Sequence, residues 1–231
     1  MIGVVVPAHN EAQGIGDTLD SLIDAAADPA LAGEAIEILV VLDACDDGTG
    51  AVAARHGVRT LAVQVRNVGL ARQAGADALL RRGARWLAFT DADTSVPPDW
   101  LAAQLALHAD GADAFCGPVE VHNWTPHGRH ALALAEHFAR LYQPVDGHRR
   151  IHGANLGVSA AAYGRAGGFA ALACSEDVAL VQALEACGAR IAWGSHPRVV
   201  TSARTDARAR GGFGDTLLEM VALHVAPQAL A

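Results

Sequence analysis

Asp91 and Asp93 stand one residue apart, directly after the apolar run "RWLAF", which predicts a buried strand. Two carboxylates on this spacing at the end of a strand can jointly hold a divalent cation, and such a cation can bridge a diphosphate. The spacing alone is a weak signal, because Asp-x-Asp triplets often arise by chance. The alternative is a solvated turn in which an aspartate caps the helix after Pro97. The elements that position the pair distinguish these interpretations.

Those elements alternate between apolar runs and alanine-rich runs. Four strands are predicted over "IGVVVPA", "AIEILVVLD", "VRTLAVQV" and "ARWLAFTDAD", followed by helices near residues 14–27, 48–56, 69–82 and 98–109. A strand followed by a helix four times over predicts a parallel α/β sheet with right-handed crossovers. The strands are continuous hydrophobic runs, as expected of strands buried on both faces.

Polar side chains follow these strands where a ligand would bind, because open α/β sheets bind ligands outside the carboxyl ends of their strands. The acidic, amide and imidazole side chains at the ends of the first, second and fourth strands are His9, Asn10, Glu11, Asp43, Asp46, Asp47, Asp91 and Asp93. Arg66 and Arg72 follow the third strand and add positive charge. We expect these groups to gather at one edge of the sheet.

The second half of the chain is less regular. It predicts one or two strands in "ADAFCGPVEVHNW", a helix near 128–142, a helix over "SEDVALVQALEACG", two short strands in "ARIAWGSHPRVVTSAR" and a final helix near 213–225. Ser175 is a candidate N-cap for the "SEDVALVQALEACG" helix, and Gly188 is a natural stop. Glu176 and Asp177 suit the positive end of that helix dipole, and Val178, Val181 and Leu184 are expected to anchor it on the core.

Composition limits the class of protein. The 231 residues are 52% hydrophobic with a mean hydropathy of +0.22, which favours one domain with a large core. A net charge of -8 disfavours a nucleic-acid partner. The four cysteines have no zinc-like spacing. Without a signal peptide or an 18-residue apolar segment, we expect a cytoplasmic protein with no transmembrane segment, although the apolar "LLEMVALHVAPQAL" is a candidate for peripheral membrane contact.

Two other enzyme classes that use a similar aspartate triplet or sheet fit poorly. Haloacid-dehalogenase phosphatases place the triplet at the start of the domain and need a later lysine, whereas here the triplet lies 90 residues in and the chain has no lysine. Sugar nucleotidyltransferases open on a glycine-rich loop with arginine and lysine, which "VVVPAHNEAQG" lacks. Both remain weaker alternatives.

Six motifs in order resemble those of family 2 glycosyltransferases of the GT-A fold. They are "VVVPAHNEAQGI", "ILVVLDACDDGT", "NVGLARQAG", "TDAD", "HGANLGVSAAAYGRAGGF" and "SEDVALVQAL", and they span nearly the whole chain. The resemblance implies one GT-A domain over residues 1–231, a Rossmann-like and mostly parallel sheet flanked by helices. Its nucleotide-sugar-binding half would cover residues 1–110 and its acceptor and catalytic half residues 111–231.

The resemblance also implies roles for individual residues. Pro7, His9 and Glu11 would line the nucleotide pocket, Asp43 would hydrogen-bond the base, Arg72 would lie beside the nucleotide, Asp91 and Asp93 would handle ribose and metal, and Asp177 would be the catalytic base, with Glu176 as its alternative. Candidates for a further metal or diphosphate contact are His196, His152 and the arginines Arg204, Arg208 and Arg210, which are expected to form a mobile lid or a solvated basic loop. Leu42 replaces an aspartate of the family pattern, and Ala160 and Ala161 stand where arginines often occur, which leaves nucleotide identity and acceptor binding open.

The expected activity is an inverting transfer of a sugar from a nucleoside diphosphate sugar, a UDP sugar in the first instance, to an acceptor hydroxyl. Mg²⁺ or Mn²⁺ on Asp93 and Asp91 would neutralise the leaving diphosphate, and Asp177 would take the acceptor proton. The alternative from another class is a non-catalytic nucleotide-sugar-binding or scaffold protein on the same fold. Sugar and acceptor are left open.

Overall fold

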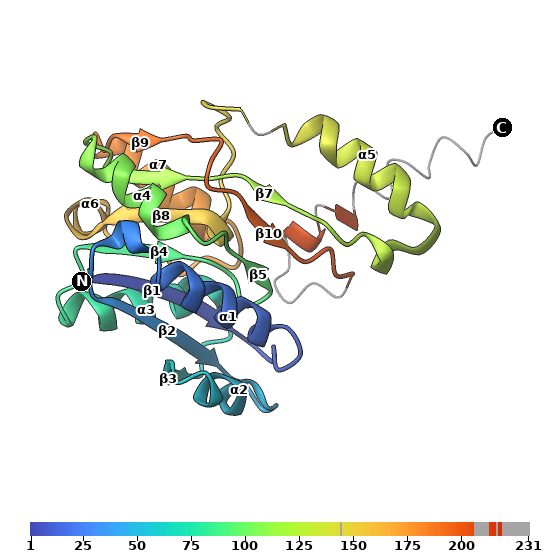
Figure 1. Ribbon diagram of the computed structural model, residues 1–231, viewed down its shortest axis with the longest axis horizontal. Coiled ribbons are helices and arrows are strands. Elements are labelled where there is room, and N and C mark those ends of the chain that lie inside the picture. Colours follow the sequence, from blue (N-terminus) through green and yellow to red (C-terminus); the bar gives the residue numbers. More distant parts are fainter. Residues whose placement is uncertain (144, 206–212, 216, 219–231) are drawn as a thin grey trace.

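The alternation of strands and helices is confirmed in the first half of the chain by a computed structural model, which describes residues 1–143, 145–205, 213–215, 217 and 218. Figure 1 shows the elements in order. They are β1 (Ile2–Ala8), α1 (Ile15–Ala26), η1 (Pro29–Leu31), β2 (Ile36–Asp43), α2 (Thr49–Arg55), β3 (Arg59–Val63), α3 (Val68–Arg81), β4 (Trp86–Phe89), β5 (Thr94–Ser95) and α4 (Trp100–Ala109). The short strand β5, directly after the aspartate pair, was not expected.

The second half contains more and shorter elements than the sequence predicts. They are β6 (Ala114–Cys116), β7 (Val119–Glu120), η2 (Thr125–His130), α5 (Ala131–Leu141), η3 (Gly153–Asn155), β8 (Leu156–Ser159), α6 (Ala160–Ala166), α7 (Glu176–Ala186), β9 (Ile191–Ala192) and β10 (Val199–Thr201). Of the expected final helix near 213–225, residues 213–215, 217 and 218 are helical, and the rest lies outside the described residues.

A seven-stranded sheet forms the centre of the molecule, in the order β3-β2-β1-β4-β8-β6-β9. The first four strands pair in parallel, as predicted. Strand β8 is antiparallel to both β4 and β6, whereas β9 returns to a parallel pairing with β6. The sheet is therefore mostly parallel, and β8 from the second half pairs directly with β4 from the first half.

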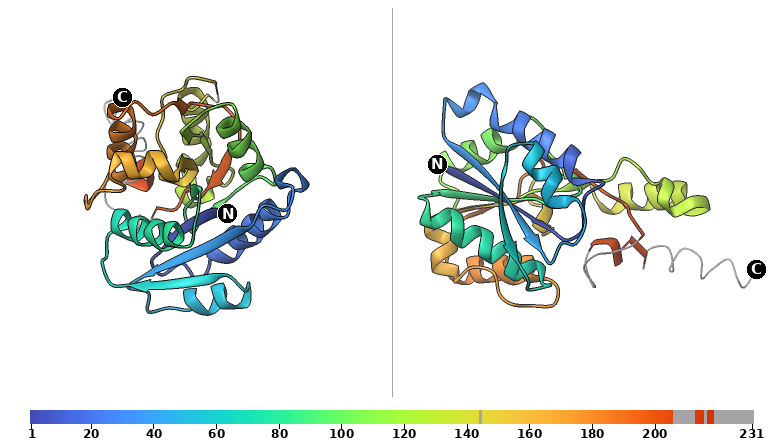
Figure 2. Two further views of the ribbon diagram at one scale, coloured as in Figure 1. Left: turned by 90° about the vertical axis from the view of Figure 1, so that its left-hand side faces the viewer. Right: turned by 90° about the horizontal axis from the view of Figure 1, so that it is seen from below.

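Helices cover both faces of this sheet, as the right-hand view of Figure 2 shows. The core on one face includes buried side chains of α1 and α4, and the core on the other includes those of α3, α6 and α7. Along β1, Val4 and Val6 belong to the first core and Val5 to the second. This alternation is the period-two geometry of a strand buried on both faces.

A second, three-stranded sheet attaches the end of the chain to the aspartate loop. Its order is β5-β10-β7, with β10 antiparallel to β5 and parallel to β7. Thr201 faces Thr94 in this pairing, and their hydroxyl oxygens lie 2.9 Å apart. The segment after β10 is thereby placed beside the loop that carries Asp91 and Asp93.

Asn155, from the "HGANLG" segment, ties the two sheets together. It is fully buried, its side-chain oxygen accepts the Trp100 indole N–H at 2.9 Å, and its amide donates to the carbonyls of Pro118 and Pro197. A buried amide is tolerated only when its donors and acceptors are satisfied. In this fold Asn155 is a structural residue.

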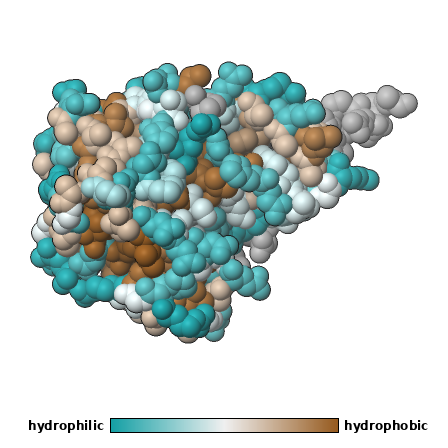
Figure 3. Space-filling model, in the orientation of Figure 1, coloured by the Kyte–Doolittle hydropathy of each residue, from teal (hydrophilic) through white to brown (hydrophobic). Residues whose placement is uncertain are grey.

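Helix α5 projects away from the central sheet (Figure 1), and apolar residues appear on this projection in Figure 3. Leu132 and Leu141 of α5 are 74% and 45% exposed, although Leu134 and Phe138 on the other side of the helix are buried. Among the described residues, no helix is long and apolar enough to span a bilayer.

Candidate active site

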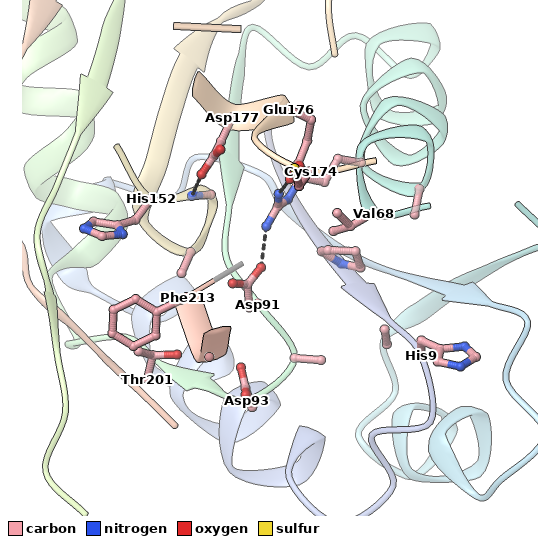
Figure 4. Close-up of a pocket in the computed structure, with 18 of the residues that line it drawn as sticks. His9, Val68, Asp91, Asp93, His152, Cys174, Glu176, Asp177, Thr201 and Phe213 are labelled. Atoms are coloured by element: carbon pink, nitrogen blue, oxygen red, sulfur yellow. Dashed lines mark hydrogen bonds and ion pairs between the residues drawn. The ribbon is translucent and has the colours of Figure 1, made fainter. Parts of the chain in front are cut away.

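A cavity of about 770 Å³ opens at the carboxyl ends of the parallel strands. Eleven of the residues expected at the site line it, namely Pro7, His9, Glu11, Asp43, Arg72, Asp91, Asp93, His152, Glu176, Asp177 and Arg204. Figure 4 shows Asp177 and Glu176 on one side of this cavity, Asp93 on the opposite side and Asp91 between them. The structure therefore gathers side chains that lie far apart in the sequence.

Among the candidates that the structure describes, His196 is not brought to the cavity. Its Nε2 lies 2.6 Å from Oδ2 of Asp99, the residue before α4, and both side chains are about half exposed. The lining residues do not include His196. A role as a third ligand beside Asp91 and Asp93 is therefore not supported by its position.

Asp43, at the end of β2, shapes the loop that follows β3. Its Oδ1 accepts the backbone N–H groups of Val65 and Arg66 at 2.8 Å each, and its Oδ2 accepts that of Asn67 at 2.9 Å. The His9 ring nitrogen Nδ1 lies 2.6 Å from the carbonyl oxygen of Asp43. Asp43 thus holds Arg66 and Asn67 at the cavity wall, and a base contact would have to use the acceptor capacity that remains.

The loops after β1 and β2 are joined by side-chain hydrogen bonds. Asn10 donates to Asp46 at 2.7 Å and accepts from its backbone N–H, while the Glu11 N–H donates to the Thr49 hydroxyl. Asn10 has a φ of 55°, and the next two strand-end loops contain Ala44 at 50° and Arg66 at 47°. Non-glycine residues in this region are strained and often occur at functional sites. The wall of the cavity is therefore a fixed set of loops.

Arg72, on α3, forms a buried ion-pair cluster at the back of the cavity. Its guanidinium pairs with Asp91 at the end of β4 and with Glu176 at the start of α7, as the dashed lines in Figure 4 show. The Arg72 and Glu176 side chains are 4% and 6% exposed. Burial works to lower the pKa of Arg72, but Asp91 and Glu176 outweigh it and raise that pKa. Burial raises the pKa of Glu176, although Arg72 opposes this effect.

Asp177 is held at the cavity by backbone groups. Its Oδ2 accepts the N–H of Gly153 at 2.7 Å, and its Oδ1 accepts the N–H of Val178 at 2.8 Å. A Cβ atom on Gly153 would lie 2.5 Å from the Arg72 guanidinium, so only glycine lets this backbone approach so closely. Asp177 is thus fixed in position, and its side chain is not committed to an arginine in the described structure.

Of the expectations about α7, the N-cap position was confirmed and one of the three anchoring residues was wrong. Ser175 occupies the N-cap position with a φ of 59°, but its side chain makes no capping hydrogen bond, because the backbone is left-handed there instead of extended. Val178 does not anchor the helix on the core but lines the cavity, and Leu180 is buried in its place together with Val181 and Leu184. The helix still packs firmly through these three residues.

Arg204 forms a second ion-pair cluster, at the front of the cavity. Its Nη1 and Nη2 lie 2.9 and 3.0 Å from the two carboxylate oxygens of Glu11, and its Nε lies 2.9 Å from Oδ2 of Asp93. Burial raises the pKa of the Asp93 carboxyl, and the Arg204 charge opposes that shift. Of the arginines expected in a loop here, Arg208 and Arg210 lie outside the described residues.

Aromatic side chains form the wall beside Asp177. The His152 ring lies 5.7 Å from that of Tyr142 and 5.9 Å from that of Phe213, and all three residues line the cavity. Burial lowers the pKa of His152 to about 4, so its ring is neutral near pH 7. Sequence reasoning did not single out Tyr142 or Phe213, because nothing in their local patterns indicates that they meet.

The carboxylates at the front of the cavity fit a divalent cation in chemistry, since Mg²⁺ and Mn²⁺ prefer carboxylate oxygens. Glu11 and Asp93 converge on one positive charge, the Arg204 guanidinium, which stands in for a cation. Within the described residues, no group of three or more histidine, cysteine, aspartate or glutamate side chains is arranged to hold a metal ion. An ion at Asp93 would therefore need ligands beyond these side chains, such as phosphate oxygens or water.

Comparison with known proteins agrees with this architecture. The sequence profile described as "Glycosyl transferase family 2" matches residues 3–169, which is more than half of the chain. A comparison with curated protein sequences finds no significant match.

Solved structures with the same fold include a mannosyltransferase and a glucosyl-3-phosphoglycerate synthase. S. aureus TarS 1–349 in complex with UDP-GlcNAc aligns with a TM-score of 0.69 and 15% identity over 96% of this chain and 65% of that chain. The mannosyltransferase PcManGT from Pyrobaculum calidifontis, in complex with GDP-Man and Mn²⁺, aligns with a TM-score of 0.61 and 20% identity over 90% of this chain and 58% of that chain. Glucosyl-3-phosphoglycerate synthase from Mycobacterium tuberculosis, in complex with Mn²⁺ and UDP, aligns with a TM-score of 0.57 and 20% identity over 90% of this chain and 72% of that chain. In a longer TarS structure the chain spans 36% of the protein.

Proposed function

The chain belongs to glycosyl transferase family 2, and we propose that it transfers one sugar from a nucleoside diphosphate sugar to an acceptor hydroxyl with inversion at the anomeric carbon. The observation that carries this proposal is one cavity lined by the aspartate pair Asp91 and Asp93 and, on another element, by Asp177. Carboxylates in these two places suit the two tasks of the reaction, which are handling the diphosphate and accepting a proton.

The donor is bound, in this proposal, by the loops after β1, β2 and β3. Pro7, His9 and Glu11 line the nucleotide pocket, and Asp43 orders the loop that presents Arg66 to it. UDP sugars are the first donors to test, because two of the similar structures contain UDP or UDP-GlcNAc, but one contains GDP-Man. The nucleobase is thus the part of the donor that these similarities constrain least.

Asp93, with help from Asp91, would hold Mg²⁺ or Mn²⁺. The ion would supply positive charge to the leaving nucleoside diphosphate. Two of the similar structures contain Mn²⁺. Arg72 keeps Asp91 in place from behind, so this carboxylate is oriented before any ligand arrives.

Asp177 is the proposed base. The acceptor oxygen attacks the anomeric carbon as its proton passes to the Asp177 carboxylate, and the bond from that carbon to the diphosphate oxygen breaks on the opposite face. The N–H of Gly153 fixes the carboxylate in the cavity. Glu176 is assigned the supporting task, because it is buried against Arg72 and is less able to receive a proton from an acceptor.

The acceptor enters, in this proposal, along the wall of Tyr142, His152 and Phe213 beside Asp177. Aromatic faces can pack against the C–H face of a sugar or against an apolar group.

A donor screen tests the proposed function. Purified protein is incubated with UDP and GDP sugars in Mn²⁺, and nucleoside diphosphate release is measured with and without candidate acceptors. Release that depends on Asp177 supports the proposal. Calorimetry with UDP should show binding in Mn²⁺ and at least about tenfold weaker binding in EDTA, because the carboxylates that line the cavity outnumber its arginines and repel a diphosphate without a cation.

Two outcomes would contradict parts of the proposal. Equal UDP affinity in Mn²⁺ and EDTA would exclude the metal role, and a product with the donor's anomeric configuration would exclude single displacement. Donor binding with no release under any condition would favour a non-catalytic nucleotide-sugar-binding protein instead.

A further inference from the structure

The Arg204 guanidinium lies between two carboxylates from the first half of the chain. It contacts both oxygens of Glu11 in a fork and also contacts Oδ2 of Asp93 through Nε and Nη2. Glu11 belongs to the loop after β1, and Asp93 lies 111 residues before Arg204 in the chain. Two oxygens of Glu11 and one of Asp93 are therefore occupied by a single positive group.

The oxygen of Asp93 that Arg204 occupies is one that a divalent ion would need. A guanidinium donates hydrogen bonds to carboxylate oxygens, and a hard cation binds the same lone pairs. Two positive charges at about 4 Å repel each other by roughly as much as a close ion pair attracts. Arg204 and a divalent cation therefore exclude each other at Asp93.

The surroundings allow the Arg204 side chain to leave without unfolding the site. Its side chain and that of Asp93 are each 20% exposed, whereas its neighbour Ala203 is 2% exposed and packs in the core. The residue lies in the irregular stretch after β10, and the hydroxyls of Thr201 and Thr94 hold that strand. The backbone is thus anchored while the long side chain can rotate.

We propose that Arg204 is an exchangeable counter-cation, which holds Glu11 and Asp93 in the donor-free protein and is displaced from Asp93 by a divalent cation bound to a nucleoside diphosphate. The released guanidinium then pairs with the diphosphate, because Arg204 lines the same cavity and a guanidinium fork matches phosphate oxygens. This inference rests on the proposed function. It implies that Arg204 weakens the binding of a divalent cation alone and strengthens the binding of a nucleoside diphosphate with that cation.

Binding of Mn²⁺ alone and of UDP with Mn²⁺ tests the exchange in the full chain. Free Mn²⁺ is measured by electron paramagnetic resonance and UDP affinity by calorimetry. Arg204→Met should bind Mn²⁺ without nucleotide about tenfold more tightly than the parent, because the competing charge is gone. The same variant should bind UDP in Mn²⁺ more weakly, by about fivefold or more, because it lacks the diphosphate contact.

Two further variants complete the design. Arg204→Lys keeps the charge but loses the planar fork, so its Mn²⁺ affinity should fall between those of the parent and Arg204→Met. Arg198→Met is the matched control, because Arg198 precedes β10, pairs with Glu120 and does not line the cavity. It should leave both affinities unchanged.

Opposite changes in the two affinities support the exchange. The exchange is overturned if both Arg204 variants bind Mn²⁺ without nucleotide no more tightly than the parent does. In that case the proposed function still stands, provided that the parent binds UDP only with Mn²⁺. If neither parent nor variants bind Mn²⁺ in the presence of UDP, the metal role in the proposed function fails as well, and the exchange falls with it.

Discussion

Two arginine clusters at one edge of the sheet use the same chemistry in different surroundings. Arg72 pairs with Asp91 and Glu176, and Arg204 pairs with Asp93 and Glu11. The Arg72 side chain is 4% exposed on the long helix α3, whereas Arg204 is 20% exposed in an irregular stretch after a three-residue strand. We therefore expect the first cluster to belong to the rigid framework of the fold and the second to exchange contacts more readily.

The physical reason is the cost of leaving a charge unpaired. Removing one partner of a buried pair leaves a charge that water cannot reach, and this costs several kcal/mol. Near the surface, water takes over the lost contact and the cost is small. We therefore expect Arg72 to stay paired with Glu176 when a ligand binds, whereas the more exposed Arg204 is the arginine proposed to change partners.

The largest effect is expected from Arg72→Gln. The Glu176 carboxylate would remain buried without its counter-charge, and the free energy of unfolding should fall by about 3–5 kcal/mol. Urea denaturation followed by circular dichroism measures this change. A loss no greater than that of Arg204→Gln would remove the distinction between the two clusters.

Asp177→Asn tests whether the catalytic base is Asp177 or Glu176, which belongs to the buried cluster. The substitution keeps the shape of the side chain and removes its basicity, so transfer should fall by roughly 10²-fold or more, while UDP affinity stays near that of the parent. Steady-state kinetics and calorimetry measure both. Stability should fall by about 1 kcal/mol, because the asparagine amide can accept only one of the two backbone N–H groups that Asp177 accepts. Glu176→Gln should lose stability first, because Glu176 belongs to the buried cluster. Full transfer activity in Asp177→Asn combined with an inactive but folded Glu176→Gln would make Glu176 the base.

Gly153→Ala tests how tightly the buried cluster is packed. The new Cβ would lie 2.5 Å from the Arg72 guanidinium, and the overpacking should cost about 1–3 kcal/mol of unfolding free energy. Gly164→Ala on α6 is a matched control, because nothing lies within 4 Å of its Cβ position and alanine favours a helix. Equal thermal denaturation midpoints for the two variants would contradict close packing at Gly153.

Arg204→Gln tests the more exposed of the two clusters. Glu11 is 10% exposed and Arg204 and Asp93 are each 20% exposed, so the unfolding free energy should fall by at most about 2 kcal/mol, less than for Arg72→Gln, and 0.5 M NaCl should shrink that difference further. Urea denaturation at low and high salt gives both values. A loss of 3 kcal/mol or more would place Arg204 in the framework beside Arg72.

Much of the fold could be predicted because its signals are local. The first four strands and their helices appear in the sequence as apolar runs followed by alanine-rich segments, and the parallel pairing follows from their alternation. Five of the eight polar residues expected at the strand ends line one cavity, because parallel strands end at the same edge; they are His9, Glu11, Asp43, Asp91 and Asp93. Asn10, Asp46 and Asp47 are not among the lining residues. The motif resemblance added Asp177, which no local pattern places there.

The pairing of the short strands could not be predicted in the same way. Short strands were expected in the segments that contain β6, β7, β9 and β10, but with two or three residues each they show no period that would indicate a partner, and β5 in the first half was not expected. Their formation depends on pairing with partners far away in the chain. The same holds for Asn155, whose neighbours Trp100, Pro118 and Pro197 come from three separate segments.

The sequence by itself determined which chemical groups stand at the ends of the strands. Each apolar run and the polar residues that follow it are neighbours in the chain, so both can be recognised from a short stretch of sequence. It also contained Arg204 as one of several arginines near glycines, with no sign of what the residue contacts. Only the tertiary structure decided that Arg72 is buried between Asp91 and Glu176 and that Arg204 faces Glu11 and Asp93 near solvent. Burial and partner depend on segments more than 100 residues apart, and the energy of a charge is fixed by those surroundings rather than by its neighbours in sequence.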